Sequence, residues 1–476
     1  MATFRRVHFI GIAGAGMSAV AKLLHDSGVV VTGSDEGVYP PVSDFLKDLG
    51  IPYQTSYAAG NLPRDADLIV IGKNAKLVPE TNPEVAAAYA SGIRIMSFPE
   101  VLSEISSAKD TIVVAGAFGK STSTALFAHC LESLPASSAG YDSSWFIGAI
   151  PLTPSTNARM GKGKLFVLEG DEYPSSNTDP RSKFLHYHPR HLLITPIAHD
   201  HVNIFPTPAD YVAPFIELTK LVPADGSIVM CLEGPLSADV LTRIARPVVT
   251  YGVHRGEYHA ADIVWGERTR FTLMRGAEKI VSLETNQLGE HNIQNIVGVA
   301  AFLLTHNIAT PEQIATAIAS FRGIRRRLDR KSEKTRLPIF EGFGSSYDKA
   351  RSAIAAMKQH FPAQRLVVVF EPHTFSWRNR ESIGWYDDVF GGASKVYIFE
   401  PAAQGAATHA QISQDEIVAR VIKAGFDAEP ISDPEHALNT IGGSLRADDV
   451  VLLLTSGNLG GLIERIPLMA EQKFPL

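Results

Sequence analysis

A short glycine-rich segment, Gly116-Ala-Phe-Gly-Lys-Ser121, has the residue types that hold the phosphates of a nucleotide. Glycines allow backbone N–H groups to approach phosphate oxygens, and the start of a following helix favours negative charge. Lys120 would reach the β- and γ-phosphates, and the Ser121 hydroxyl would be offered to Mg²⁺. The strict pattern GxxxxGK[ST] is not met, because Val114 occupies its first glycine position. The apolar run before the loop and the helical pattern after it predict a strand-loop-helix.

Two later apolar runs end in side chains that are able to bind a metal ion. The run LFVLEGDEY ends in Glu169, Asp171 and Glu172, and the run HLLITPIAHDH ends in Asp200 and His201. Ligands of open α/β sheets bind at the carboxyl ends of strands, and oxygen atoms suit Mg²⁺. Each group taken alone is also compatible with a solvated turn. Zinc is a weaker hypothesis, because the histidines between positions 186 and 201 lack a usual zinc spacing and no cysteine is near.

A second glycine-rich turn lies near the N-terminus, with the spacing Gly11-x-x-Gly14-x-Gly16. It is close to the dinucleotide pattern GxGxxG without matching it, and it would present amides to a diphosphate. The next apolar run ends in Ser34 and Asp35, which are placed for ribose or base contacts. NAD binding is a rival interpretation, although a nicotinamide enzyme would not need a second phosphate loop with its own carboxylates.

The elements that must position these groups are short apolar runs alternating with helical patterns. The runs are continuously apolar, which predicts parallel sheets covered on both faces and an α/β fold class. A length of 476 residues suggests about three domains. The predicted boundaries lie near residues 106–109 and 323–327, giving domains 1–107, 108–324 and 325–476.

The composition excludes several classes of protein. The formal net charge of −6 gives no sign of nucleic-acid or membrane binding, and no protein partner is predicted. No run of about 20 apolar residues is present, as a membrane span would require. Cys130 and Cys231 form no disulfide framework, which fits a reducing compartment. The N-terminal run has the outline of a signal peptide but is soon interrupted by Lys22, so a cytoplasmic location is expected.

Taken together, these segments resemble the Mur ligases, which build the peptidoglycan precursor. The matching segments are HFIGIAGAGMSAVA for the UDP-binding turn, GAFGKSTST for GTHGKTTT, EGDEY for EADE, the DH of Asp200-His201, LGEHNIQN for LGxHNxxN, and GIRRRLD for the linker arginines. The resemblance implies an ATP-dependent carbon–nitrogen ligase of peptidoglycan synthesis. It also implies a Rossmann-like N-terminal UDP-binding domain, a central P-loop ATPase domain with a mostly parallel sheet, and a Rossmann-like C-terminal domain.

The same resemblance implies three sets of site residues. ATP would be bound by Gly116, Gly119, Lys120, Ser121, Thr122, His291, Asn292 and Arg326. The UDP-sugar would be bound by Gly11, Gly14, Ala15, Gly16, Met17, Ser34 and Asp35. The catalytic residues would be Lys120, Glu169 and His201. Two Mg²⁺ ions would be held by Ser121, Glu169 and His201.

Within the family, three stretches resemble the murein peptide ligase branch: GVYPPVS (37–43), FIGAIPL (146–152) and DPRSKFLHYHPR (179–190). That branch joins the peptide L-Ala-γ-D-Glu-meso-diaminopimelate to the lactoyl carboxylate of UDP-N-acetylmuramate, through an acyl phosphate, in peptidoglycan recycling. The predicted partners are therefore ATP, UDP-N-acetylmuramate and a murein peptide. Three alternatives stay open: the L-alanine-adding ligase, whose PHRYTR motif is echoed at residues 372–378, another Mur-type amide ligase, or a homologue that binds nucleotides without turnover.

The chain departs from the family pattern at several positions. Ala117 and Phe118 replace the threonine and histidine of GTHGK, and residues 195–196 replace the TN or NN before DH. The segment 341–347 replaces DD[YF]xHHP and loses one acidic residue and two histidines. Ile216 lies near the position at which some relatives carry a carbamylated lysine, so none is predicted here.

Overall fold

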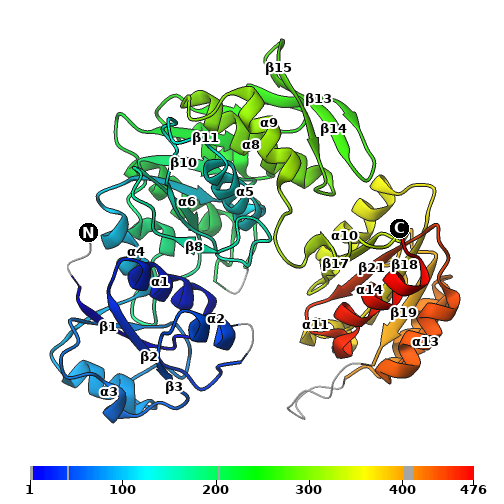
Figure 1. Cartoon of the computed structure of the whole chain (residues 1–476), viewed down its shortest axis with the longest axis horizontal. Helices are drawn as coiled ribbons and strands as arrows, with labels where there is room; N and C mark the ends of the chain where they lie inside the picture. Colours follow the sequence, from blue (N-terminus) through cyan, green and yellow to red (C-terminus); the bar gives the residue numbers. More distant parts are fainter. Residues whose placement is uncertain (1–3, 40–41, 202–203, 401–410) are drawn as a thin grey trace. The chain divides into compact units, whose positions relative to one another are not determined.

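The computed structural model of the protein describes residues 4–39, 42–201, 204–400 and 411–476. In these ranges three sheets follow one another along the chain, in blue, in cyan to green and in yellow to red in Figure 1. Most strand pairs within them are parallel, so the predicted α/β class is confirmed. Positions 40 and 41 of the GVYPPVS segment lie outside the described residues. No helix in the described ranges is long and apolar enough to cross a membrane.

The first sheet has five parallel strands in the order β3-β2-β1-β4-β5. Its strands are β1 (Arg6–Ile10), β2 (Val30–Ser34), β3 (Tyr53–Gln54), β4 (Leu68–Ile71) and β5 (Arg94–Met96). Its helices are α1 (Ala15–Asp26), α2 (Val42–Asp48), α3 (Pro83–Ala90) and α4 (Phe98–Ser106). Because β1 is flanked by β2 on one side and β4 on the other, its carboxyl end is a topological switch point, where such sheets bind ligands.

The second sheet has the order β15-β14-β13-β12-β11-β10-β6-β9-β7-β8. Its strands are β6 (Asp110–Ala115), β7 (Ser144–Phe146), β8 (Ala158–Arg159), β9 (Leu165–Gly170), β10 (His191–Ile194), β11 (Ser227–Cys231), β12 (Val249–Tyr251), β13 (Tyr258–Val264), β14 (Thr269–Arg275) and β15 (Glu278–Thr285). Its helices are α5 (Lys120–Glu132), α6 (Pro208–Leu221), α7 (Ser237–Thr242), α8 (Glu290–Thr305) and α9 (Pro311–Ser320). Strand β6 pairs in parallel with both β9 and β10, so the carboxyl ends of these three strands meet at one edge.

The third sheet has the order β16-β17-β21-β18-β19-β20, with only β16 antiparallel to its neighbour. Its strands are β16 (Arg327–Arg330), β17 (Ile339–Phe343), β18 (Arg365–Phe370), β19 (Lys395–Phe399), β20 (Ala428–Ile431) and β21 (Asp449–Thr455). Its helices are α10 (Tyr347–His360), α11 (Phe375–Arg378), α12 (Gln414–Lys423), α13 (Pro434–Ser444) and α14 (Leu462–Lys473). Strand β21 is buried along its whole length, as expected for a central strand with helices on both faces.

The chain folds into two compact units whose bounds differ from the three predicted domains. The first unit comprises Met1–Asp262, Phe271–Glu284 and His291–Phe321. The second comprises Ile263–Arg270, Thr285–Glu290 and Arg322–Leu476. Two short segments from the region predicted to be the central domain therefore pack with the C-terminal sheet. The boundaries at 107 and 324 stay predictions.

A half-buried pair of histidines joins the amino ends of β10 and β11 to the end of α8. His191 Nδ1 lies 2.9 Å from the Ser227 hydroxyl, and His306 Nε2 lies 2.7 Å from the same oxygen. Burial and the neighbouring His306 lower the pKa of His191 to about 4. Burial also lowers the pKa of His306. Both rings are therefore neutral in the folded protein at neutral pH.

This pair predicts a loss of stability in mild acid. The unfolded chain binds a proton at His191 near pH 6.5, whereas the folded chain does so only near pH 4, so the stabilisation present above pH 6.5 is lost between these values. At pH 5 the loss amounts to about 2 kcal/mol for His191. We expect the melting temperature of the wild-type protein to fall more steeply from pH 7 to pH 5 than that of His191→Gln. An equal fall in melting temperature from pH 7 to pH 5 in the two proteins would contradict the lowered pKa of His191.

Candidate functional site

The predicted strand-loop-helix is present at the carboxyl end of β6. Residues 116–119 connect β6 to α5, which begins at Lys120, and both loop glycines have positive φ angles. A Cβ atom at Gly116 would lie 2.1 Å from the Thr195 hydroxyl oxygen, and one at Gly119 would lie 2.2 Å from Asn295 Oδ1. Neither position accepts a larger residue, because the loop is pressed between the end of β10 and α8. The backbone is thus held in the conformation that presents amides to a phosphate.

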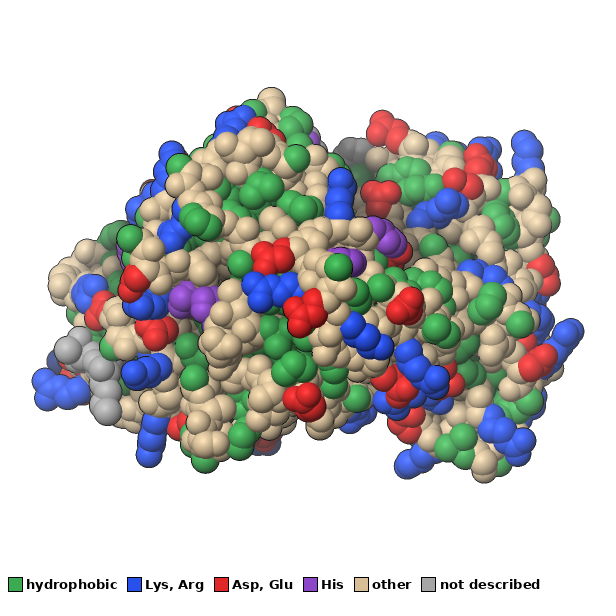
Figure 2. All heavy atoms as spheres, turned by 90° about the horizontal axis from the view of Figure 1, so that it is seen from above, with side chains coloured by type: hydrophobic (Ala, Val, Ile, Leu, Met, Phe, Trp, Pro, Cys, Tyr) green, Lys and Arg blue, Asp and Glu red, His purple; other side chains and the backbone are tan. Residues whose placement is uncertain are grey.

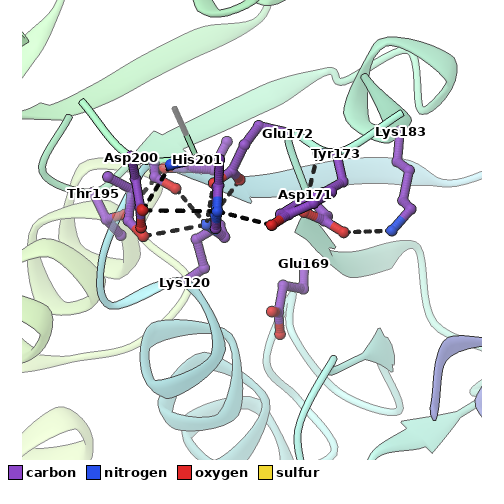
Figure 3. Close-up of polar contacts among 12 residues, drawn as sticks. Lys120, Glu169, Asp171, Glu172, Tyr173, Lys183, Thr195, Asp200 and His201 are labelled. Atoms are coloured by element: carbon purple, nitrogen blue, oxygen red, sulfur yellow. Dashed lines mark hydrogen bonds and ion pairs between the residues drawn. The ribbon is translucent and has the colours of Figure 1, made fainter. Parts of the chain in front are cut away.

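The Lys120 side chain folds back over this loop, where it contacts a backbone carbonyl and a carboxylate (Figure 3). Its ammonium group donates a 2.6 Å hydrogen bond to the Gly116 carbonyl and forms a 2.8 Å ion pair with Glu172. The Glu172 side chain is fully buried and that of Lys120 is 14% exposed. An ammonium group placed above a glycine loop at a helix N-terminus is suited to binding phosphate oxygens.

Glu169, at the end of β9, lies directly beside the first turn of α5. Its Oε1 accepts a 2.7 Å hydrogen bond from the Ser121 hydroxyl, and its Oε2 accepts a 2.6 Å hydrogen bond from the Gly148 backbone N–H. Burial raises the pKa of Glu169, although both hydrogen bonds oppose that effect. A hydroxyl and a carboxylate in contact form a donor set that fits Mg²⁺, which takes its other ligands from phosphates and water.

His201 follows β10 and contacts the same acidic turn. Its Nδ1 lies 2.8 Å from the Tyr173 hydroxyl, and its Nε2 lies 3.4 Å from Glu172 Oε1. The hydrogen bond with Glu172 raises the pKa of His201. The Tyr211 hydroxyl donates to the same Glu172 oxygen at 3.2 Å. Glu172 therefore joins Lys120 to His201, as the dashed lines in Figure 3 show.

The predicted Mg²⁺ ligands Ser121, Glu169 and His201 stay a prediction. The structure places Glu169 against Ser121 and places His201 against Glu172. Within the described ranges, no three histidine, cysteine or acidic side chains form a ready-made metal cluster. The donors present fit Mg²⁺ ions whose shells are completed by a bound nucleotide. The histidines considered for zinc bond to separate partners, such as the Phe205 carbonyl for His199.

The N-terminal glycine turn uses several of its own amides internally. The N–H groups of Gly11 and Ile12 donate to the Ser34 carbonyl at 2.8 and 3.1 Å, and the Gly14 N–H donates to the Gly11 carbonyl at 3.3 Å. The Asp35 carboxylate accepts from the Ala13 N–H at 2.9 Å. The amides in the first turn of α1 have no intrahelical acceptor, so they are the donors that this turn could offer to a diphosphate. Those amides belong to the predicted residues Ala15, Gly16 and Met17.

The Ser34 hydroxyl is bonded within the protein, and the predicted role of Ser34 at the UDP-sugar stays a prediction. Ser34 is fully buried, and its hydroxyl donates to Glu84 at 2.7 Å. Glu84 also accepts from the Asn61 side chain and contacts His8 at 2.8 Å. Ser34 thus helps to build the turn through its carbonyl, while its side chain belongs to a buried polar network.

The residues predicted to hold adenine lie on α8, which is joined to the phosphate-loop helix. Asn292 is buried, and its Oδ1 accepts from the Asn295 side chain at 3.2 Å, while His291 is exposed. Asn295 Oδ1 in turn accepts from the Ser123 hydroxyl on α5 at 3.1 Å. Thr122 lies in the first turn of α5. The sequence motif LGEHNIQN contained Asn295, but its link to the phosphate loop required the fold.

Arg326 belongs to the second compact unit. Its backbone N–H donates to Asp329 at 2.6 Å, and its guanidinium lies 3.3 Å from Glu341. Glu341 also forms a 2.7 Å ion pair with Lys331. Glu341, the acidic residue that remains from the family's C-terminal motif, is therefore buried and ion-paired with both Arg326 and Lys331. The role of Arg326 in ATP binding stays a prediction.

Four residues that shape the site are not among the site residues that the family resemblance implied. Glu172, Tyr173, Gly148 and Asn295 all contact predicted site residues. Glu172 was visible as one of three acidic residues after β9, but nothing in the spacing distinguished its role from that of Glu169. Two cations that follow the acidic turn are already ion-paired: Arg181 with Asp179 at 2.7 Å and Lys183 with Asp171 at 2.5 Å.

Comparison with known proteins identifies the family. Residues 6–110 match the model of the Mur ligase family, catalytic domain, and residues 114–303 match the Mur ligase middle domain. UDP-N-acetylmuramate–L-alanine ligase from Halorhodospira halophila is 32% identical over 478 residues, which cover 96% of this chain and 92% of that protein.

Two solved structures have the same fold. UDP-N-acetylmuramate–alanine ligase from Thermotoga maritima superposes with a TM-score of 0.77 at 23% identity, covering 98% of this chain and 99% of that one. UDP-N-acetylmuramate:L-alanyl-γ-D-glutamyl-meso-diaminopimelate ligase from Neisseria meningitides gives a TM-score of 0.60 at 29% identity, covering 68% of this chain and all of that one. The chain has the three-domain fold of these enzymes and belongs to the Mur ligase family of ATP-dependent ligases, which join acids to amino acids in peptidoglycan synthesis.

Proposed function

We propose that the protein uses ATP and Mg²⁺ to join L-alanine to the lactoyl carboxylate of UDP-N-acetylmuramate. The observation that carries the choice of L-alanine is the 32% identity to an L-alanine-adding ligase over nearly the full length of both chains. The sequence stretches that resembled the murein peptide ligases favoured a tripeptide acceptor instead. That second candidate keeps support from the 29% identity to the Neisseria enzyme over 68% of this chain.

In this proposal each domain supplies one substrate site. Residues 1–107 bind the UDP-sugar through the first turn of α1, and Asp35 holds the glycine turn in place through the Ala13 amide. Residues 108–324 bind ATP through the phosphate loop and α8. Residues 325–476 provide the site for the incoming amine.

The proposed reaction at the phosphate loop brings the negative charges of the substrate carboxylate and the ATP phosphates together. A carboxylate attacks the γ-phosphorus of ATP and displaces ADP, which gives an acyl phosphate. Two anions approach each other in this step, so their repulsion must be offset. Lys120 places a positive charge above the loop, and the buried Glu172 holds its ammonium group in that position. Ser121 and Glu169 would hold one Mg²⁺ ion and His201 the other, and these ions neutralise phosphate charge when bound. The amine then attacks the acyl phosphate, which releases phosphate and leaves an amide.

A single assay separates the candidate functions. Purified protein receives ATP, Mg²⁺ and UDP-N-acetylmuramate with either L-alanine or L-Ala-γ-D-Glu-meso-diaminopimelate, and phosphate release is followed. We expect release with L-alanine to exceed release with the tripeptide by at least about tenfold, since the correct amine fills the acceptor site. Reactions that lack UDP-N-acetylmuramate are the control and should release no phosphate.

The other outcomes each have a definite meaning. Release with the tripeptide alone would replace L-alanine by the second candidate. Binding of ATP without release in either reaction would contradict both candidates and would indicate a homologue that binds nucleotides without turnover.

A further inference from the structure

His360, the last residue of α10, contacts two backbone groups that are far from it in sequence. Its Nε2 lies 2.7 Å from the Gly289 backbone nitrogen, and its Nδ1 lies 2.8 Å from the Gly266 carbonyl oxygen. The side chain is 3% exposed, and the Trp265 ring packs edge-on against it with ring centres 5.2 Å apart. All of these residues belong to the second compact unit.

The two backbone partners fix the protonation of the ring. A backbone N–H only donates, so Nε2 must accept the hydrogen bond from Gly289. A carbonyl only accepts, so Nδ1 must carry the proton that is donated to Gly266. Burial lowers the pKa of His360, which agrees with a neutral ring. His360 therefore has one tautomer and one orientation, and both of its nitrogens are used.

The segment held by His360 has a second anchor in the same unit. Leu288 is 1% exposed and packs in the hydrophobic cluster that contains Phe340, Met357 and Phe361. Gly289 has a φ angle of +90°, a conformation that larger residues adopt only with strain. Glu290, with which α8 begins, follows directly. The anchors of the approach to α8 thus include the apolar contact of Leu288 and the hydrogen bond that the Gly289 N–H donates to the ring of His360.

We propose that His360 is a positioning residue for nucleotide binding, because it fixes Gly289 and hence the start of α8, where His291 and Asn292 lie. This inference rests on the proposed function, in which those two residues hold the base of ATP. The phosphate loop meets α8 at Asn295, about one turn beyond the start that His360 fixes, so a loss of the His360 contact is expected to weaken ATP binding more than it slows the chemical step. No sequence motif includes His360.

Two substitutions of His360 separate its two hydrogen bonds. An asparagine amide occupies the position of Nδ1 and is able to donate to Gly266, whereas a glutamine amide extends to the position of Nε2 and is able to accept from Gly289. We expect His360→Asn to raise the KM for ATP about tenfold, with kcat within about threefold of the wild type. We expect His360→Gln to restore the KM to within about threefold. Hydrogen exchange of the peptide 285–292 should accelerate in His360→Asn and stay near the wild-type rate in His360→Gln.

The controls distinguish this inference from the function on which it rests. The affinity for UDP-N-acetylmuramate, measured by calorimetry, should be the same in all three proteins. If both variants showed the wild-type KM for ATP and wild-type exchange, the role of His360 would be overturned while the proposed function stood. Equal increases of KM and exchange in both variants would also overturn it, because they would indicate general loosening of the unit. Failure of the wild-type protein to bind ATP would overturn the proposed function itself, and the role of His360 with it.

Discussion

Replacing Lys120 by alanine should lower turnover by about 10³-fold, because the ammonium group is the side-chain cation built into the phosphate loop. Removing one preorganised group that stabilises developing charge typically costs 10²- to 10³-fold, and a full charge lies at the upper end. The ammonium group is fixed by the Gly116 carbonyl and by Glu172, so it needs no reorganisation to reach a bound phosphate. The measurement is phosphate release at saturating ATP. Turnover near the wild-type rate would refute the assignment of the loop.

The same substitution leaves the buried Glu172 without its cation, so the effect on folding must be measured separately. Lys395→Ala is a matched control, because Lys395 is also 14% exposed and is ion-paired with Asp427 and Glu429, in the C-terminal sheet. It should keep wild-type turnover. The double variant Lys120→Ala/Glu172→Gln should recover melting temperature relative to Lys120→Ala but recover no turnover. Recovery of both would show that the single variant fails through misfolding.

Replacing Glu169 by glutamine should lower turnover by about 10²-fold and raise the Mg²⁺ concentration needed for half-maximal activity. A glutamine amide has one oxygen, so it is unable to accept from both Ser121 and the Gly148 backbone, as Glu169 does. It also lacks the charge that suits a Mg²⁺ ligand. The measurement is a Mg²⁺ titration of phosphate release in both proteins. An unchanged Mg²⁺ requirement would remove Glu169 from the metal site.

Asp449→Asn is the control for substituting a buried carboxylate. Asp449 is fully buried and forms a two-point ion pair with Arg365 in the C-terminal sheet, with hydrogen bonds of 2.8 and 2.7 Å. Its replacement should lower the melting temperature and leave the Mg²⁺ requirement unchanged. A shift in Mg²⁺ requirement for Asp449→Asn would mean that the titration reports stability rather than metal binding.

The parts of the site that could be predicted from sequence are those with local signals. Gly116 and Lys120 stand between a continuous apolar run and a helical pattern, so their strand-loop-helix setting follows from neighbouring residues. Glu169 and His201 each follow an apolar run, which placed both at strand ends. These strand ends meet because β9 and β10 flank β6, an order that depends on long-range pairing.

The parts that could not be predicted depend on tertiary contacts. Ser34 ends β2 and Asp35 follows it, and both are polar, yet the Ser34 side chain points inward to Glu84 while Asp35 accepts a hydrogen bond from the glycine turn. The burial of Glu172 between Lys120 and His201 likewise needs three separate elements to come together. The composition of the sequence does not indicate that two short segments, Ile263–Arg270 and Thr285–Glu290, belong to the second compact unit.

The net charge of the sequence agrees with the mixed charges on the face drawn in Figure 2, but it does not locate the site. On the face drawn in Figure 2, basic side chains lie next to acidic ones rather than in a field of one sign. This agrees with the small net charge of −6. In the proposed function, anionic substrates would therefore be held by local groups such as Lys120 and helix N-termini, rather than by the overall field of the protein.

The most direct test of the proposed chemistry follows an oxygen atom from substrate to product. UDP-N-acetylmuramate labelled with ¹⁸O in its lactoyl carboxylate is converted by the wild-type protein with ATP, Mg²⁺ and L-alanine, and the released phosphate is analysed by mass spectrometry. Attack of the carboxylate on the γ-phosphorus, followed by attack of the amine on the acyl carbon, leaves one carboxylate oxygen in the phosphate. The account predicts one ¹⁸O atom per phosphate released. Phosphate free of ¹⁸O, formed together with the amide product, would contradict it.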